Sequence, residues 1–100
     1  MDIRQELTHG TLDVHMSGKF TFPDHLGFRD VIDKMNAGDI QQVVLNVEKM
    51  DFIDSAGLGM LLLALDAAEK NHKKLVIGGA TGQVKKMFDL ARFENMFTLN

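Results

Sequence analysis

One serine stands where its hydroxyl could carry chemistry: Ser55, in the stretch MDFIDSAGLG that runs from Met50 to Gly59. It lies between two apolar runs, with Asp54 before it and Gly57 two residues after it. Three interpretations are open for such a residue. Ser55 could cap the helix that is expected to begin here, act as the nucleophile of a hydrolase, or accept a phosphate.

The cap and the nucleophile can be weighed from the neighbouring residues. A capping serine is worth about 1 kcal/mol, but Asp54 is an equally good cap. A hydrolase nucleophile sits on a strained turn that needs a glycine two residues to either side of the serine. Gly57 meets this requirement, whereas Ile53 occupies the other position and no histidine is near in sequence. The sequence therefore predicts no catalytic residue and no enzyme.

A phosphate on Ser55 is compatible with a helix start. The free N–H groups and the positive end of the helix dipole tolerate an anion there. The phosphate would add about 1.5 to 2 negative charges beside Asp54 and near Asp51. The fold could survive this change while an apolar docking surface around Leu58 and Met60 became repulsive. The third interpretation is thus a surface switch.

The other polar motifs carry less chemistry. The loop Gly78–Gly82 lacks the Lys-Ser/Thr ending of a phosphate-binding loop and predicts a close turn between a strand and a helix. The histidines are scattered without paired ligand spacing, and there is no cysteine. We therefore expect neither a metal nor a cofactor.

Length and charge narrow the function classes. A chain of 100 residues is expected to form one domain, residues 1–100. A net charge of −3 without a basic cluster argues against direct nucleic-acid binding. The longest uncharged stretch, Ser55–Leu65, is too short to span a bilayer, and the polar N-terminus is unlike a signal peptide. A cytoplasmic, bacterial-type protein without membrane insertion is expected.

The hydrophobic pattern predicts the elements that must position Ser55. Period-2 alternation predicts strands over residues 3–7 and 12–16, joined by a tight turn at His9–Gly10. Further strands are expected at Val43–Val47, covered on both faces, at Lys74–Gly78, and at Phe97–Leu99.

Three helices are predicted between these strands. They begin at Pro23, at Asp54–Ser55 and at Thr81, and the first stops at Asn36–Gly38. Their expected core stripes are Phe28, Val31, Ile32 and Met35 in the first, Leu58, Leu61, Leu62, Leu65 and Ala68 in the second, and Val84, Met87, Phe88 and Ala91 in the third. Met60, Leu63 and Ala64 lie off the second stripe. The predicted fold class is α/β: a mixed sheet, with an antiparallel opening hairpin and then parallel strands, packed with three to four helices.

These residues resemble a known family. The segment VVLNVEKMDFIDSAGLGMLLLAL, Val43–Leu65, resembles the signature strand, loop and helix of STAS domains (sulfate transporter and anti-sigma factor antagonist). The similarity extends from Ile3 to Leu99 and includes KLVIGGATGQVKKMFDLARFENMF, which is similar to the late strand and third helix of the family.

The resemblance implies a bacterial anti-sigma factor antagonist that works by partner switching. Such a protein binds a serine-kinase anti-sigma factor and thereby releases a sigma factor. The kinase inactivates it by phosphorylating the serine after the motif's aspartate, here Ser55, and a PP2C-type phosphatase restores it. The same likeness implies that the partner-binding residues are Asp54, Ala56, Gly57, Leu58, Gly59 and Met60. Ala56 stands where many relatives have a second hydroxyl, so Ser55 is the motif's single hydroxyl.

One segment departs from the family pattern. Well-known antagonists have a turn like Gly-Glu-Leu-Asp where this chain reads Gly18-Lys19-Phe20-Thr21, without the acid. The run GKFTFPDHLGFRDVIDKM is more similar to a proteobacterial subgroup tied to flagellar and biofilm control. A STAS scaffold, or a regulatory subunit of a stressosome-like or membrane transport complex, is the alternative function. The oligomeric state, the sigma factor and the individual partners are left open.

Overall fold

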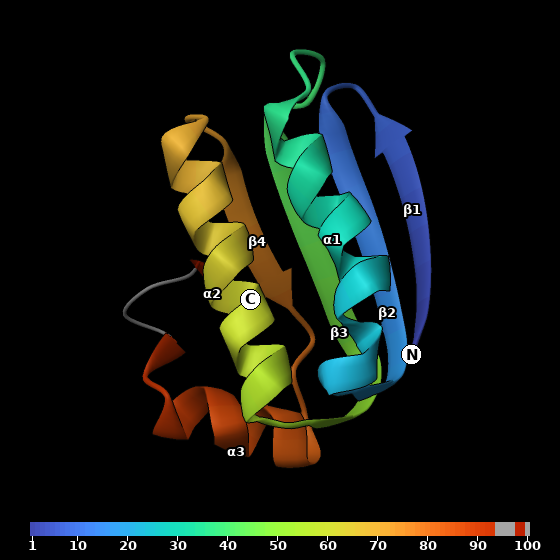
Figure 1. Ribbon diagram of the computed structural model, residues 1–100, viewed down its shortest axis with the longest axis vertical. Helices are drawn as coiled ribbons and strands as arrows, with labels where there is room; N and C mark the ends of the chain where they lie inside the picture. Colours follow the sequence, from blue (N-terminus) through green and yellow to red (C-terminus); the bar gives the residue numbers. More distant parts are fainter. Residues whose placement is uncertain (94–97, 100) are drawn as a thin grey trace.

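A five-stranded sheet with helices on one of its faces forms the body of the protein. The computed structural model describes residues 1–93 and 98–99. The strands lie side by side in the order in which they occur in the sequence, from β1 to β5. Helices α1 and α2 run along the same face of the sheet, and α3 lies across one end of it (Figure 1). The predicted mixed sheet is confirmed.

The first two strands form the predicted antiparallel hairpin. Strand β1 is Asp2–Thr8, β2 is Thr11–Phe20, and Thr8 pairs with Thr11 across the turn. His9 and Gly10, the two turn residues, have φ angles of 50° and 80°. Two-residue hairpin turns of this hand match the twist of the strands, so the turn sets the register that places Leu12, Val14 and Met16 in the core.

The remaining strands are parallel, as predicted. Strand β3 is Gln42–Ile53 and pairs with β2 on one side and with β4, Lys74–Gly78, on the other. Strand β5, Thr98–Leu99, pairs with β4, while Phe97 of the predicted last strand lies outside the described residues.

The prediction that Val43–Val47 is covered on both faces is wrong. Val43, Leu45 and Val47 are buried, whereas Val44 and Asn46 between them are only half-buried. Strand β3 therefore alternates like a strand with one covered face. The reason is the placement of α1 and α2 on the same face, which leaves the opposite face of β2 and β3 without a helix (Figure 1).

In residues 1–90, three α-helices and the short 3-10 turns η1 and η2 lie in the connections between strands. The first connection holds η1 (Phe22–Asp24), α1 (His25–Asp33) and η2 (Lys34–Asn36), the second is α2 (Ser55–Lys70), and the third is α3 (Gly82–Leu90). The predicted stripes of α1 and α3 are confirmed, with Phe28, Val31, Met35, Val84 and Phe88 fully buried and Ile32, Met87 and Ala91 packed at the edge of the core.

The predicted stripe of α2 is rotated from the observed one. Leu61 and Ala68 are buried as expected, but Leu62 is 41% exposed, while Met60 and Ala64 are buried. The small residues Gly57 and Ala64 are both buried, and at Gly57 the helix backbone lies close to the ends of β2 and β3. The larger leucines Leu58 and Leu65 lie at the edge of the core.

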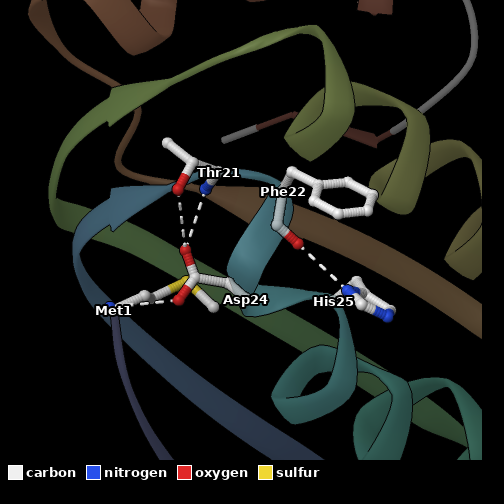
Figure 2. Close-up of polar contacts among 5 residues, drawn as sticks. All are labelled: Met1, Thr21, Phe22, Asp24 and His25. Carbon is white, nitrogen blue, oxygen red and sulfur yellow. Dashed lines mark hydrogen bonds and ion pairs between the residues drawn. The ribbon is translucent and has the colours of Figure 1, made fainter.

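A small polar cluster ties the start of the chain to η1. The carboxylate of Asp24 accepts a bond from the backbone N–H of Thr21 at 2.9 Å and pairs with the amino group of Met1 at 3.2 Å (Figure 2). Partial burial acts to raise the pKa of Asp24, but the hydrogen bond from Thr21 and the Met1 ammonium outweigh it and hold that pKa below its ordinary value.

Because the pKa of Asp24 is lower in the folded protein, its stabilising contribution is present at neutral pH and lost in acid. We expect Asp24→Asn to lower the free energy of unfolding at pH 7 by about 1 kcal/mol. This difference from the wild type should shrink as the pH falls below the ordinary carboxyl range and vanish once the carboxyl of Asp24 is protonated in the folded protein as well. Urea unfolding at several pH values measures it, with the exposed Asp39→Asn as a matched control. A difference that persists unchanged in acid would contradict the assignment.

Candidate functional site

The candidate site lies at the edge of the sheet where the parallel strands end. Strands β2 and β3 finish together, with Phe20 paired to Ile53. Three segments follow at this edge: η1 after β2, the start of α2 after β3, and the start of α3 (Figure 1). We call residues Ile53–Gly57 the Ser55 turn.

Asp54 caps α2, as its position in the sequence predicted. Its Oδ1 accepts a bond from the Gly57 N–H at 2.8 Å, and its extended backbone ends the strand. Its own N–H donates to the Phe20 carbonyl at 3.3 Å. The cap of α2 is therefore supplied by Asp54, and Ser55 is the first residue inside the helix.

Gln83 in the first turn of α3 holds the other side of the Ser55 turn. Its side-chain Oε1 accepts from the Ile53 N–H at 3.0 Å, and its Nε2 donates to the Ile53 carbonyl at 2.9 Å. The sequence analysis missed this residue. Nothing in the local sequence marks it, because its partner is thirty positions away in the chain.

Gly57 is a packing residue. It is buried, and a Cβ atom built on it would lie 2.6 Å from the Phe20 carbonyl oxygen and 2.7 Å from Cγ1 of Ile53. Only glycine fits this close approach of α2 to the ends of β2 and β3. Gly59, by contrast, has open space around its Cα.

Ser55 is exposed, and its hydroxyl has no hydrogen-bond partner in the part of the chain that the structure describes. No hydrogen bond joins a described histidine to this hydroxyl. The first N–H groups of a helix lack intrahelical partners, and here the N–H of Gly57 donates to the Asp54 carboxylate and that of Asp54 to the Phe20 carbonyl. The position is sterically open to a bulky anion.

Exposed apolar side chains lie on α2 and on the two elements, α1 and η1, that pack against it. Ser55, Gly59 and Leu62 share one face of the helix by their spacing. Helix α2 packs against α1 and η1, whose Leu26 and Phe22 are 74% and 66% exposed. We call Phe22, Leu26, Leu62 and Leu63 the apolar surface. Phe22 and Leu26 were missed by the sequence analysis, although both lie off the predicted stripe of α1.

The other predicted partner-binding residues differ in how accessible they are. Ala56, Leu58 and Gly59 are half-buried. Met60 is only 7% exposed, so its side chain belongs to the core of this structure. Of the predicted partner-binding residues, Gly57 and Met60 are thus buried, while Asp54, Ala56, Leu58 and Gly59 are partly accessible next to the exposed Ser55.

A hollow of about 420 Å³ lies elsewhere, on β1, β2 and β3. Its lining does not include the Ser55 turn; it consists of Asp2, Ile3, Arg4, His15, Met16, Ser17, Asn46, Glu48 and Lys49. Among residues 1–93, no group of three or more histidine and acidic side chains is arranged so that it could hold a metal ion. None of the described helices has the length and hydropathy to cross a membrane.

Comparison with known proteins gives consistent matches over nearly the whole chain. Residues 3–99 match the family model described as "Mlab, STAS domain". A STAS-domain containing protein of Pseudomonas aeruginosa is 29% identical over 96% of this chain and 89% of its own length. The anti-sigma-B factor antagonist of Staphylococcus aureus is 26% identical over 91% of this chain and 77% of its own. The Bacillus cell fate determinant SpoIIAA, solved in its phosphorylated form, superposes with a TM-score of 0.78 at 18% identity, over 99% of this chain and 91% of its own.

Proposed function

The chain belongs to the STAS-domain family, and from this premise we propose that it is an anti-sigma factor antagonist switched by phosphorylation of Ser55. The observation that carries the proposal is an exposed serine with a free hydroxyl at the start of α2, on the same helix face as the exposed Leu62. The name of the Staphylococcus aureus relative and the phosphorylated form of SpoIIAA support it.

In the proposed mechanism the unmodified protein docks a kinase-type anti-sigma factor against the apolar surface and the Ser55 face of α2. Docking presents the Ser55 hydroxyl to the γ-phosphate of ATP held by the partner. The hydroxyl oxygen bonds to that phosphorus, ADP leaves, and the serine proton passes to solvent or to a base of the kinase. A PP2C-type phosphatase hydrolyses the ester and restores the hydroxyl.

The physical effect of the phosphate is local. At the start of α2 it meets the positive end of the helix dipole, so the fold retains its stability. In the docked complex the same charge, next to Asp54, would be desolvated against apolar side chains, which is strongly unfavourable. Release of the partner follows from this difference between the free and docked states.

The test is capture of the partner followed by addition of ATP. Immobilised wild-type protein should retain, from an extract of its host, a protein with serine-kinase activity, and ATP should release it with phosphate transferred to the bait. A poorly hydrolysed ATP analogue is the control and should leave the complex intact. Retention of membrane-transporter subunits without any kinase activity would favour the alternative, a STAS subunit of a transport complex.

A further inference from the structure

Helix α3 is joined directly to the strand end that precedes Ser55. The Gln83 side chain bonds to both backbone polar groups of Ile53, at 3.0 Å and 2.9 Å. A side-chain amide that pairs with an N–H and a C=O of the same residue fixes both the position and the tilt of that peptide segment. We call these two bonds the Gln83 clamp. Ile53 is two residues before Ser55, so the clamp acts on the backbone that leads to the Ser55 hydroxyl.

The two ends of this clamp belong to well-fixed elements. On α3, Val84 and Phe88 are buried beside Gln83, and the ring of Phe88 stacks on Phe93 with centroids 4.9 Å apart. On the other side of the Ser55 turn, the Asp54 N–H donates to the Phe20 carbonyl. The backbone of Ile53 and Asp54 is therefore held from two directions, by α3 and by the end of β2.

The connection from β4 to α3 contains two glycines that let it lie close to β3. Gly79 has a φ of 84°, and a Cβ there would lie 2.9 Å from Cβ of Glu48 and 3.1 Å from its backbone nitrogen. Gly82, the residue before Gln83, also has a positive φ of 56°. The two glycines bring the first turn of α3 to the end of β3, where Gln83 reaches Ile53.

We propose that Gln83 is a positioning residue for Ser55, and that α3 is a second element through which the switch is set. The position of α3 fixes the Ser55 turn in the shape that a partner docks against and modifies. Because coupling between two sites is reciprocal, a change at Ser55 must alter the stability of α3 to the same extent as a change at α3 alters the Ser55 turn. The relevance to switching rests on the proposed function, whereas the coupling itself does not.

The first test is amide hydrogen exchange by NMR on the purified chain, which needs no partner. The protected amides to follow are those of Ile53, Asp54 and Gly57, with Leu12 and Val14 as an internal reference for global opening. Gln83→Ala should raise exchange at the first three by about tenfold relative to the reference, as expected for losing two hydrogen bonds of ordinary strength. Gln83→Asn, too short to reach both groups, should do the same. Lys86→Ala, exposed on the same helix, should not.

The second test asks for coupling, which a merely structural glutamine would not show. Ser55→Glu should change the exchange of the α3 amides from Val84 to Phe88 in the wild-type background, and this change should disappear when Gln83→Ala is added. Equal effects of Ser55→Glu in both backgrounds would overturn the proposal, as would unchanged exchange at the Ser55 turn in Gln83→Ala. If the coupling is observed but the capture experiment retains no kinase, the role of Gln83 is supported and only the proposed function is contradicted.

Discussion

Gly57→Ala is expected to lower the free energy of unfolding by about 2 to 3 kcal/mol, because overpacking in a core costs this much. The new methyl group would lie 2.6 Å from the carbonyl oxygen of Phe20, which is backbone and accepts the Asp54 N–H. It cannot move without weakening the bond that closes the Ser55 turn. The side chain of Ile53, at 2.7 Å, blocks the other direction.

Gly59→Ala is the matched control, two residues further along the same helix. Apart from the backbone of its own helix turn and its chain neighbours, no heavy atom lies within 4 Å of the position its Cβ would take. Alanine is a better helix former than glycine by about 0.8 to 1 kcal/mol, so this variant should be more stable than the wild type. Thermal melts of the two variants should therefore shift in opposite directions, with Gly57→Ala falling by roughly 10 °C. Two shifts of the same sign would contradict the close packing at Gly57.

Ser55→Glu is expected to weaken binding of the captured kinase-type partner at least tenfold, while the fold stays intact. An acidic residue in the first turn of a helix stabilises it by about 0.3 to 1 kcal/mol, so the melting temperature should not fall. In the complex, the same carboxylate would be desolvated next to Asp54 and the apolar surface, and a tenfold loss corresponds to only about 1.4 kcal/mol. A phosphate carries more charge, so its effect should be larger.

Two variants separate this effect from a change in net charge or in the helix cap. Thr8→Glu adds the same charge at the hairpin turn, the opposite end of the sheet, and should bind as the wild type does. Ser55→Ala removes the hydroxyl but leaves the Asp54 cap, so it should bind and remain stable. Titration calorimetry with the purified partner measures all three. Ser55→Glu binding as tightly as Ser55→Ala would remove the electrostatic basis of the switch.

The elements of this fold could be predicted from the sequence where apolar and polar residues follow a strict periodic pattern. The alternation around Leu12, Val14 and Met16, with His9–Gly10 before it, is sufficient for a hairpin, and β4 has the predicted bounds. Strand β3 continues to Ile53, well past the predicted Val47, because pairing with β2 compensates for charged residues that pattern alone places in a loop.

The face of α2 could not be predicted, because its first turns are apolar almost all round. Periodicity then gives no unique direction, and packing decides it: Gly57 and Ala64 are buried, and Leu62 is exposed. The role of Gln83 could not be predicted from the sequence, for a different reason. Its two bonds join segments that only the tertiary fold brings together, and a glutamine in the first turn of a helix is otherwise unremarkable.

The position of the transferred phosphate decides whether Ser55 is the switch. The captured kinase-type partner and ATP are incubated with the wild type and with Ser55→Ala, and the modified residue is mapped by peptide mass spectrometry. We expect one phosphate per chain, on Ser55, and none on Ser55→Ala. Phosphate on another residue, with Ser55→Ala modified as readily as the wild type, would contradict this expectation.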